Sequence, residues 1–559
     1  MGTDRHGVAF RPVCATSLYW APDYNVGMSR GILALCVLLL FVPAAHADRD
    51  AFLAARDKLE MADYETLGPD ERDRLFEALG QHDHPDAIKV YASVGSSFGT
   101  YLSGLEYTQA NLQERMRPFA DRTALSPQET GVRNSLTKKI QKAELDWRRA
   151  NQSMVTLVKV LGSYKDSKTV NAAVSILPSH ATWRVRQLFA EAAPLWHTLL
   201  GDAALSKRIF AALKKLTRDK DPRVRVAVAR GMVAFKRMEA IQLLEASIKD
   251  ADWSVRSAAV QSLAATASSE AVGALIRAMQ KEKGRLAGDI NTALKQLTGR
   301  NMQFADMWAK WWQGVGEQLP AKKEAGEQAG GSATPTRKFE NTDRFYGIET
   351  RSDRILYIID VSGSMNKEVE EFKQVTITGK KDIDTPVGGK TRVEVAKNEL
   401  KRAISQLNPK KYFAIIFFNQ ATKPWRTEMV KATPANKKDA YRSIDVVKAS
   451  GATYTLGALR EAFSMAGAIR SGGKKRAVTK REGPALDTIF LLSDGGPTDN
   501  KTEAVKSMDP EIILDNVRGW NKDLNVVIHT VAVHTEELGS YFLKQLAAQN
   551  NGEFRARTK

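Results

Sequence analysis

The chain has 559 residues, of which 43% are hydrophobic and 26% are charged. This length predicts two or more domains, and the composition excludes a chain that is disordered throughout. The formal net charge of +19 favours acidic partners. It selects no class of partner, because the sequence contains no arginine-rich arm and no specific nucleic-acid motif.

Residues 1–47 are predicted to be an N-terminal extension followed by a secretory signal peptide. Arg30 precedes an apolar run too short to span a bilayer comfortably, and Ala45 and Ala47 form an A-x-A cleavage pattern. We expect cleavage after Ala47, with translation starting at Met1 or at Met28; an uncleaved membrane anchor is the alternative. Processing would remove both cysteines and export the protein to the periplasm, the cell envelope or the medium. No later apolar run is long enough to cross a membrane.

Residues 48–177 are predicted to be helical. The segment 126–161 starts with Ser-Pro and is rich in helix formers and charge, which indicates a long amphipathic helix in a hairpin. The stretch QHDHPD at residues 81–86 brings two His and two Asp together and could in principle bind a metal. A polar turn before the next helix is the favoured interpretation, because no further ligand set is evident.

Residues 178–317 contain an internal repeat. The segments 181–189, 220–228 and 251–259 superimpose, with apolar residues at the i, i+3, i+4 spacing of one buried helix face. An arginine follows the first apolar position in each copy. The apolar positions are Val185, Leu188 and Phe189, then Val224, Ala227 and Val228, then Val255, Ala258 and Ala259.

These copies resemble HEAT repeats, whose D-x-x-V-R pattern is visible at 221–225 and 252–256. The resemblance implies a curved all-α solenoid used as a scaffold or as a surface for a second partner. Trp308, Trp311 and Trp312 lie at helical spacing near the end of the array, where we expect them to cap its core.

Residues 318–342 lose periodicity and gather Gly, Pro, Ala, Lys and Glu, which is typical of a flexible linker. Relative motion of the flanking domains is the default expectation. In residues 343–559, near-continuous apolar runs alternate with amphipathic helical segments. This alternation predicts an α/β domain with a doubly wound, mostly parallel sheet, as in Rossmann-like folds.

Oxygen-bearing side chains follow the predicted strands of this domain. Asp360, Ser362 and Ser364 follow one strand, Asp494 follows another, and Thr453 lies in a loop before a helix. Ligands of such sheets bind beyond the carboxyl ends of the strands. Hydroxyl and carboxylate oxygens suit magnesium, and neutral hydroxyl ligands leave the ion enough charge to attract an external anion. The carboxylates can support the coordinating waters and hydroxyls.

The D-V-S-G-S motif at 360–364, the Gly-Ala-Thr loop at 451–453 and the LLSDGGPTD segment at 491–499 resemble the metal-ion-dependent adhesion site of von Willebrand factor type A (VWA) domains. The resemblance implies Mg²⁺, or another divalent cation such as Mn²⁺ or Ca²⁺. The two serines and the threonine would contact the metal and the two aspartates would act largely through water. A Glu or Asp carboxylate of a protein partner would complete the shell. The implied function is non-enzymatic binding, adhesion or scaffolding, with no catalytic residue.

This chain departs from the family at three places. The stretch 367–390 is longer than usual, the basic segment 471–483 precedes the Asp494 strand, and His534 replaces a common glycine. The sequence leaves two other functions open. One is a basic scaffold that binds polyanions without metal. The other is a metal-assisted hydrolase. The sequence argues against it, because it contains no P-loop, G-x-S-x-G elbow or H-E-x-x-H helix.

Overall fold

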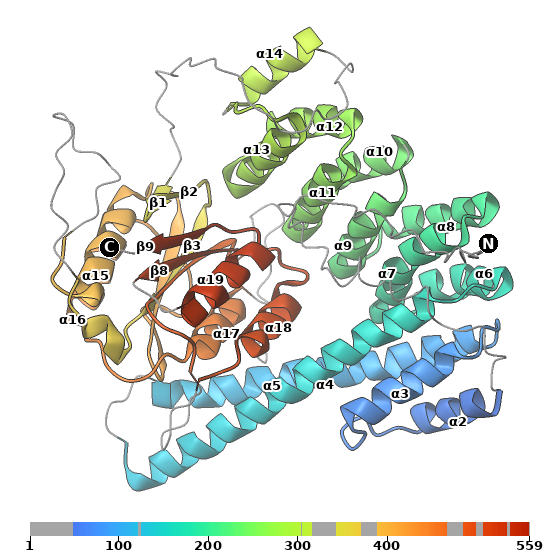
Figure 1. Cartoon of the computed structure of the whole chain (residues 1–559), viewed down its shortest axis with the longest axis horizontal. Helices are drawn as coiled ribbons and strands as arrows, with labels where there is room; N and C mark the ends of the chain where they lie inside the picture. The colour runs from blue at the N-terminus through green and yellow to red at the C-terminus, as the bar shows by residue number, and fades with distance from the viewer. Residues whose placement is uncertain are drawn as a thin grey trace, which may run out of the picture.

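A computed structural model shows a helical N-terminal part and a C-terminal α/β domain (Figure 1). The predicted fold class is therefore confirmed. The structure describes residues 49–120, 125–236, 238–302, 304–315, 343–369, 388–466, 485–498, 507–533 and 537–557.

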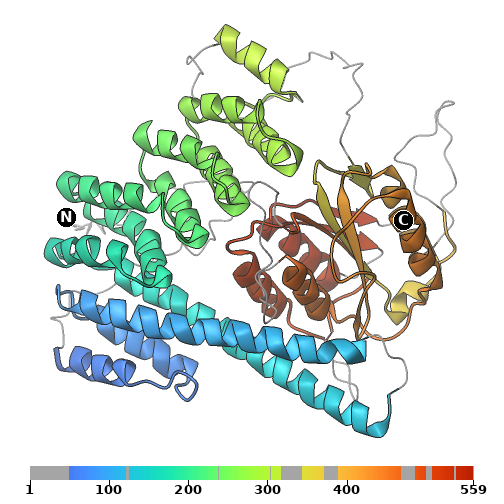
Figure 2. The same ribbon diagram turned by 180° about the vertical axis from the view of Figure 1, so that it is seen from behind.

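A long helical hairpin dominates the N-terminal region. Its second helix starts where the sequence predicts, because Ser126 accepts a hydrogen bond from the Glu129 N–H while the Glu129 side chain accepts one from the Ser126 N–H. In both views the hairpin runs from the first helices to the underside of the α/β domain (Figures 1 and 2). The helices of this region are α2 (Arg49–Glu60), α3 (Pro69–Gly80), α4 (Ala87–Ala120), α5 (Pro127–Gly162) and α6 (Ser167–Ile176).

Stacked helices form the next region, and the three predicted repeat segments lie at the starts of α7, α9 and α11. All nine apolar repeat positions are buried, as the periodicity predicts. Trp308 is also fully buried, and its indole N–H donates to Asn291 Oδ1 at 2.8 Å. The helices are α7 (Trp183–Leu200), α8 (Ala203–Leu216), α9 (Pro222–Gly231), α10 (Met238–Ser247), α11 (Trp253–Thr266), α12 (Ser269–Met279), α13 (Gly284–Thr298) and α14 (Ala305–Val315).

The repeated arginines join each copy to the next. Arg186 donates to both carboxylate oxygens of Asp219, at 2.6 and 2.9 Å, and Arg225 donates to those of Asp250, both at 2.8 Å. Such bidentate pairs fix geometry as well as contributing energy. Each of the three arginines also donates to the backbone carbonyl six residues before it, and Arg256 forms this bond with the Asp250 carbonyl at 2.8 Å.

The α/β domain contains a seven-stranded sheet of order β5-β4-β3-β7-β8-β9, with β6 also paired to β4. Strands β4, β3, β7, β8 and β9 are parallel, whereas β5 and β6 pair antiparallel with β4. A separate hairpin consists of β1 (Asp343–Phe345) and β2 (Ile348–Thr350). The sheet strands are β3 (Arg354–Asp360), β4 (Tyr412–Phe418), β5 (Thr422–Pro424), β6 (Val430–Lys431), β7 (Thr488–Ser493), β8 (Val527–Val533) and β9 (Phe554–Arg557).

Helices cover both faces of this sheet, so its central strands are almost wholly apolar and buried. The helices α15 (Arg392–Gln406) and α16 (Pro434–Val446) contribute to the core on one face. The core on the other face includes α17 (Thr455–Met465), α18 (Pro510–Asn521) and α19 (Glu537–Gln549) and continues into the helical region.

Buried contacts join the two parts of the chain. The carboxylate of Glu144, on α5, forms a buried ion pair with Arg460 of α17. Beside this pair, the ring of Trp147 stacks on that of Trp520 with centroids 6.3 Å apart. The default expectation of relative motion does not fit this interface, because separating the parts would expose both charges and both rings.

The repeat helices make a second set of contacts with the α/β domain. Lys522 pairs with Glu191 at 2.7 Å, and Arg230 donates to Asn525 Oδ1 at 3.0 Å. Arg285, at the start of α13, is buried and donates to the Asp487 carbonyl next to β7. Helices far apart in sequence therefore hold the sheet from two sides (Figure 2).

Several predicted features lie outside the described residues. They are the signal peptide in 1–47, the linker 318–342, most of the long stretch 367–390, the basic segment 471–483 and His534. Among the described helices, none combines the length and the apolarity needed to cross a bilayer.

Candidate metal centre

The five predicted ligands lie where neighbouring parallel strands end. Asp360 is the last residue of β3, and Asp494 directly follows β7, which pairs with β3 in parallel register. Ser362 and Ser364 lie at the short 3-10 turn Gly363–Asn366, whose Met365 is buried and anchors the turn. Because these strand ends meet at one edge of the sheet, residues 130 positions apart become neighbours.

Four of the five side chains form one hydrogen-bonded group. The Ser362 and Ser364 hydroxyl oxygens lie 3.0 Å apart, and the Ser364 hydroxyl donates to Asp494 Oδ1 at 2.7 Å. Asp360 Oδ1 accepts from the Ser362 N–H at 2.8 Å. The two serines therefore stand between the two carboxylates.

Thr453 lies on the adjoining loop. Gly363 N donates to the Gly451 carbonyl at 2.8 Å, which fastens this loop to the serine turn. Gly451 has a φ of +77°, a conformation that glycine adopts readily and most residues do not. The Thr453 hydroxyl faces the loop after β7, since a Cβ at Gly495 would lie 3.9 Å from its Oγ1. Thr453 is thus placed at the same edge as the other four residues.

Burial and charge make Asp360 an unusual carboxyl group. Burial, followed by the negative charge of Asp494, raises its pKa to about 6, although hydrogen bonds from Ser493 and Ser362 act in the opposite direction. Ser493, which the sequence analysis did not select, donates its hydroxyl to Asp360 Oδ2 at 2.5 Å. A cation between the two carboxylates would relieve their repulsion.

Arg392 is a further residue that the sequence analysis missed. It is the first residue of α15, and its guanidinium donates to Asp494 Oδ2 at 2.7 Å. The side chain is 13% exposed and that of Asp494 is fully buried. Arg392 directly follows the N-cap residue Thr391, so it lies in the first turn of α15, where a positive charge interacts unfavourably with the helix dipole. This unfavourable placement is the sequence signal that could have indicated a role for Arg392.

The residues present fit a hard divalent ion. Octahedral magnesium, with bonds of about 2.1 Å, places adjacent ligand atoms about 3.0 Å apart. The separation of 3.0 Å between the Ser362 and Ser364 hydroxyl oxygens is close to that edge length, and Asp494 Oδ1 accepts from Ser364 at 2.7 Å. All candidate donors are oxygens, which suits Mg²⁺, Mn²⁺ or Ca²⁺ better than softer metals.

The α/β domain and the stacked helices are each similar to a known protein family. Residues 383–556 match the family model of the von Willebrand factor type A domain. The C-terminal α/β domain is a VWA domain. Residues 210–295 match the model of HEAT repeats, which confirms HEAT repeats over the second and third of the predicted copies.

The chain also has curated relatives. The human inter-alpha-trypsin inhibitor heavy chain H2 is 26% identical over 200 residues, which cover 35% of this chain and 17% of that protein. The heavy chain H1 of Bos taurus is 24% identical over 205 residues, covering 37% and 18%. The chain therefore spans less than a fifth of the length of these relatives.

Solved structures with a similar domain include a von Willebrand factor type A protein from Catenulispora acidiphila, with 16% identity and a TM-score of 0.25. The match covers 38% of this chain and 40% of that one. The pilus adhesin SpaC from Lactobacillus rhamnosus GG has 14% identity and a TM-score of 0.25, with coverage of 37% and 28%.

Proposed function

We propose that this protein is an exported, non-enzymatic binding protein whose VWA domain holds a divalent cation and through it a carboxylate of a protein partner. The observation that carries the proposal is the group formed by Asp360, Ser362, Ser364 and Asp494, with Thr453 on the adjoining loop. Bound there, magnesium would supply a positive charge with room for an external oxygen ligand.

The hydroxyl and the carboxylate side chains have different roles in this proposal. Ser362, Ser364 and Thr453 offer neutral oxygens to the ion. Asp494 would hold the Ser364 hydroxyl in place and Asp360 the Ser362 backbone N–H, as their hydrogen bonds indicate, and both would hold the coordinating waters.

Arg392 adds a second positive charge beside the site. Its guanidinium holds one oxygen of Asp494, so the other oxygen stays turned toward Ser364. A guanidinium near the rim also favours an acidic partner over a neutral one, because complementary charge raises the rate of encounter.

Magnesium calorimetry on the full chain tests the proposal. We expect wild type to bind one equivalent of Mg²⁺ at this site and Asp360→Ala to lose it. Asp445→Ala is the matched control, because Asp445 is an exposed carboxylate of the same domain that pairs with Lys401. Equal magnesium binding by wild type and Asp360→Ala would refute the metal site.

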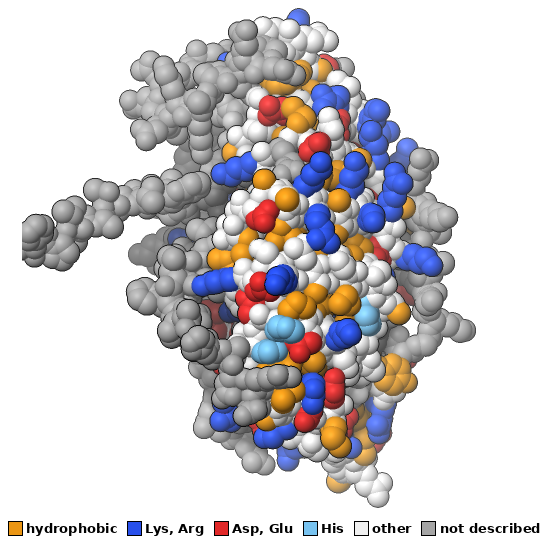
Figure 3. Space-filling view, turned by 90° about the vertical axis from the view of Figure 1, so that its right-hand side faces the viewer, with side chains coloured by type: hydrophobic (Ala, Val, Ile, Leu, Met, Phe, Trp, Pro, Cys, Tyr) orange, Lys and Arg blue, Asp and Glu red, His pale blue; other side chains and the backbone are white. Residues whose placement is uncertain are grey.

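A metal-dependent pulldown from one extract then tests the partner. Proteins retained by wild type in magnesium, and lost both with EDTA and with Asp360→Ala, are the expected result. Retention that survives EDTA but falls steeply with salt would instead favour polyanion binding. Figure 3 shows Lys and Arg over much of one described face, with acidic and hydrophobic side chains between them.

A further inference from the structure

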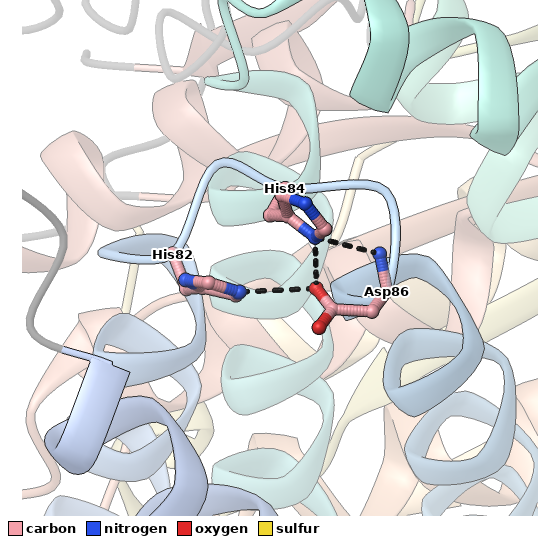
Figure 4. Close-up of side chains that lie close together, drawn as sticks. All are labelled: His82, His84 and Asp86. Atoms are coloured by element: carbon pink, nitrogen blue, oxygen red, sulfur yellow. Dashed lines mark hydrogen bonds and ion pairs between the residues drawn. The ribbon is translucent and has the colours of Figure 1, made fainter.

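The turn between α3 and α4 brings together three side chains that can bind metal. His82, His84 and Asp86 each offer one ligand atom, and these atoms all lie within 4.8 Å of one another. His82 Nε2 lies 3.0 Å from Asp86 Oδ1, and His84 Nδ1 lies 2.6 Å from the same oxygen. Figure 4 shows both rings turned toward this carboxylate.

This convergence needs either an N–H proton or a metal ion between the side chains. Each neutral imidazole carries one N–H, which can donate to Asp86 Oδ1, whereas an unprotonated ring nitrogen and the carboxylate oxygen present lone pairs that a metal ion can take. The Asp86 backbone N–H points at His84 Nδ1, with a separation of 3.4 Å. In the tautomer that carries no proton on this nitrogen, its lone pair is the one that a metal ion takes.

The donor set also fits one class of metal. Two imidazoles and one carboxylate are a recurring three-ligand set for zinc, with the fourth position left to water. A tetrahedral zinc with bonds of 2.0–2.2 Å places its ligand atoms about 3.4 Å apart. The two nitrogen–oxygen pairs, at 3.0 and 2.6 Å, therefore need to separate by less than about 1 Å, and the two ring nitrogens, which lie within 4.8 Å of each other, need to take up the same spacing. Asp86 and His84 are more than half exposed and can make this adjustment.

The surrounding structure holds the turn in place. His82 is nine-tenths buried, and its ring lies against that of Phe52 of α2 with centroids 4.3 Å apart. Asp83 Oδ2 accepts from the backbone N–H groups of Lys165 and Asp166, both at 2.7 Å, which fastens the turn to the start of α6. The site is thus built on packed helices, although its ligands lie on a loop.

We propose that His82, His84 and Asp86 form a second metal site, selective for zinc or a similar first-row ion, that fastens the α3–α4 turn. The oxygen-rich VWA site favours magnesium, whereas imidazole nitrogens favour zinc, so the two sites differ in metal preference. The sequence has no cysteine after Cys36, so no thiolate of residues 37–559 competes for the zinc.

Zinc titration of the full chain, in saturating magnesium at pH 7.5, tests this proposal. We expect wild type and Asp360→Ala to bind one equivalent of Zn²⁺ with the same affinity, and zinc to raise the thermal midpoint of both. His84→Gln is expected to weaken zinc binding at least about 100-fold, because losing only an outer partner of a ligand already costs about 10- to 100-fold. The zinc-dependent rise of the midpoint should disappear with it.

His180→Gln is the matched control, because His180 lies outside the cluster and accepts a backbone hydrogen bond from Thr182 N. Asp86→Asn, which keeps the shape of the side chain, gives a second test should His84→Gln affect folding. Absence of zinc binding by wild type, or equal zinc affinity in wild type, His84→Gln and Asp86→Asn, would overturn the proposal. Zinc binding lost in Asp360→Ala instead would assign the ion to the VWA domain.

Discussion

Replacing Glu144 by alanine is expected to destabilise the full chain strongly. The Glu144 and Arg460 side chains are 6% and 9% exposed, so removal of the carboxylate leaves a buried guanidinium without its ionic partner. Breaking a buried pair in this way costs about 3–5 kcal/mol. Arg460 also lies 3.3 Å from the Tyr454 hydroxyl, a long hydrogen bond, and near the charge of Glu461, and we expect these contacts to offset only part of that loss.

Urea unfolding, followed by circular dichroism and by tryptophan fluorescence, measures the effect. Trp147 and Trp520 stack beside the ion pair, so their fluorescence reports on the interface. The double variant Glu144→Leu/Arg460→Leu should recover most of the lost stability, because apolar replacement of both partners of a buried pair is often neutral or stabilising. Asp515→Ala breaks the exposed Asp515–Arg518 pair and should cost about 0.5 kcal/mol or less.

If Glu144→Ala lowers the free energy of unfolding by less than about 1 kcal/mol, the Glu144–Arg460 pair behaves as a solvent-exposed ion pair. That result would show that α5 and α17 are not packed together in solution. A double variant as unstable as Glu144→Ala would equally contradict the reasoning, because the cost would then arise from the packing of α5 alone.

Two further predictions concern charge in the VWA domain. Arg392→Ala should tighten magnesium binding about 5- to 10-fold, because it removes a positive charge from the site and one unit-charge pair at about 4 Å is worth about 1 kcal/mol even in water. Magnesium calorimetry measures the effect, with Arg442→Ala as the control, because Arg442 is an exposed arginine of α16. Unchanged or weaker magnesium affinity in Arg392→Ala would contradict the prediction. His529 should lower the stability of the folded chain in acid. Burial, and then the charge of Arg285, lower its pKa to about 3. The unfolded chain, in which the His529 pKa has its usual value of about 6.5, therefore takes up a proton at a pH where the folded chain does not. The stability difference between wild type and His529→Gln should therefore fall by about 2–3 kcal/mol from pH 7.5 to pH 4.5 in urea titrations, and a difference independent of pH would exclude the effect.

Much of the fold could be predicted because its signals are local. The apolar run at 355–360 predicted β3, and the i, i+3, i+4 triplets predicted which faces of α7, α9 and α11 are buried. The approach of Asp360 to Asp494 followed from one general rule, that ligands gather at the carboxyl ends of parallel strands.

Other features depend on contacts that sequence spacing does not encode. Arg392 reaches Asp494 across 102 residues, and the position where α15 starts decides that contact. The QHDHPD stretch shows two histidines and two aspartates, but only the turn geometry selects Asp86 rather than Asp83 to face both rings. The packing of α5 against α17 and α18 likewise requires the tertiary fold.

The candidate metal site and the interface with the helical part share one rigid element. Helix α17 begins at Thr455, two residues after Thr453, and carries Arg460 little more than one turn later. A VWA domain separated from the helices would leave Arg460 without Glu144 and would expose the Trp520 ring. Since the loop of Thr453 leads directly into that helix, loosening the helix would also loosen the loop. Metal and partner binding should therefore be measured on the full chain, in which α5 holds α17 in place.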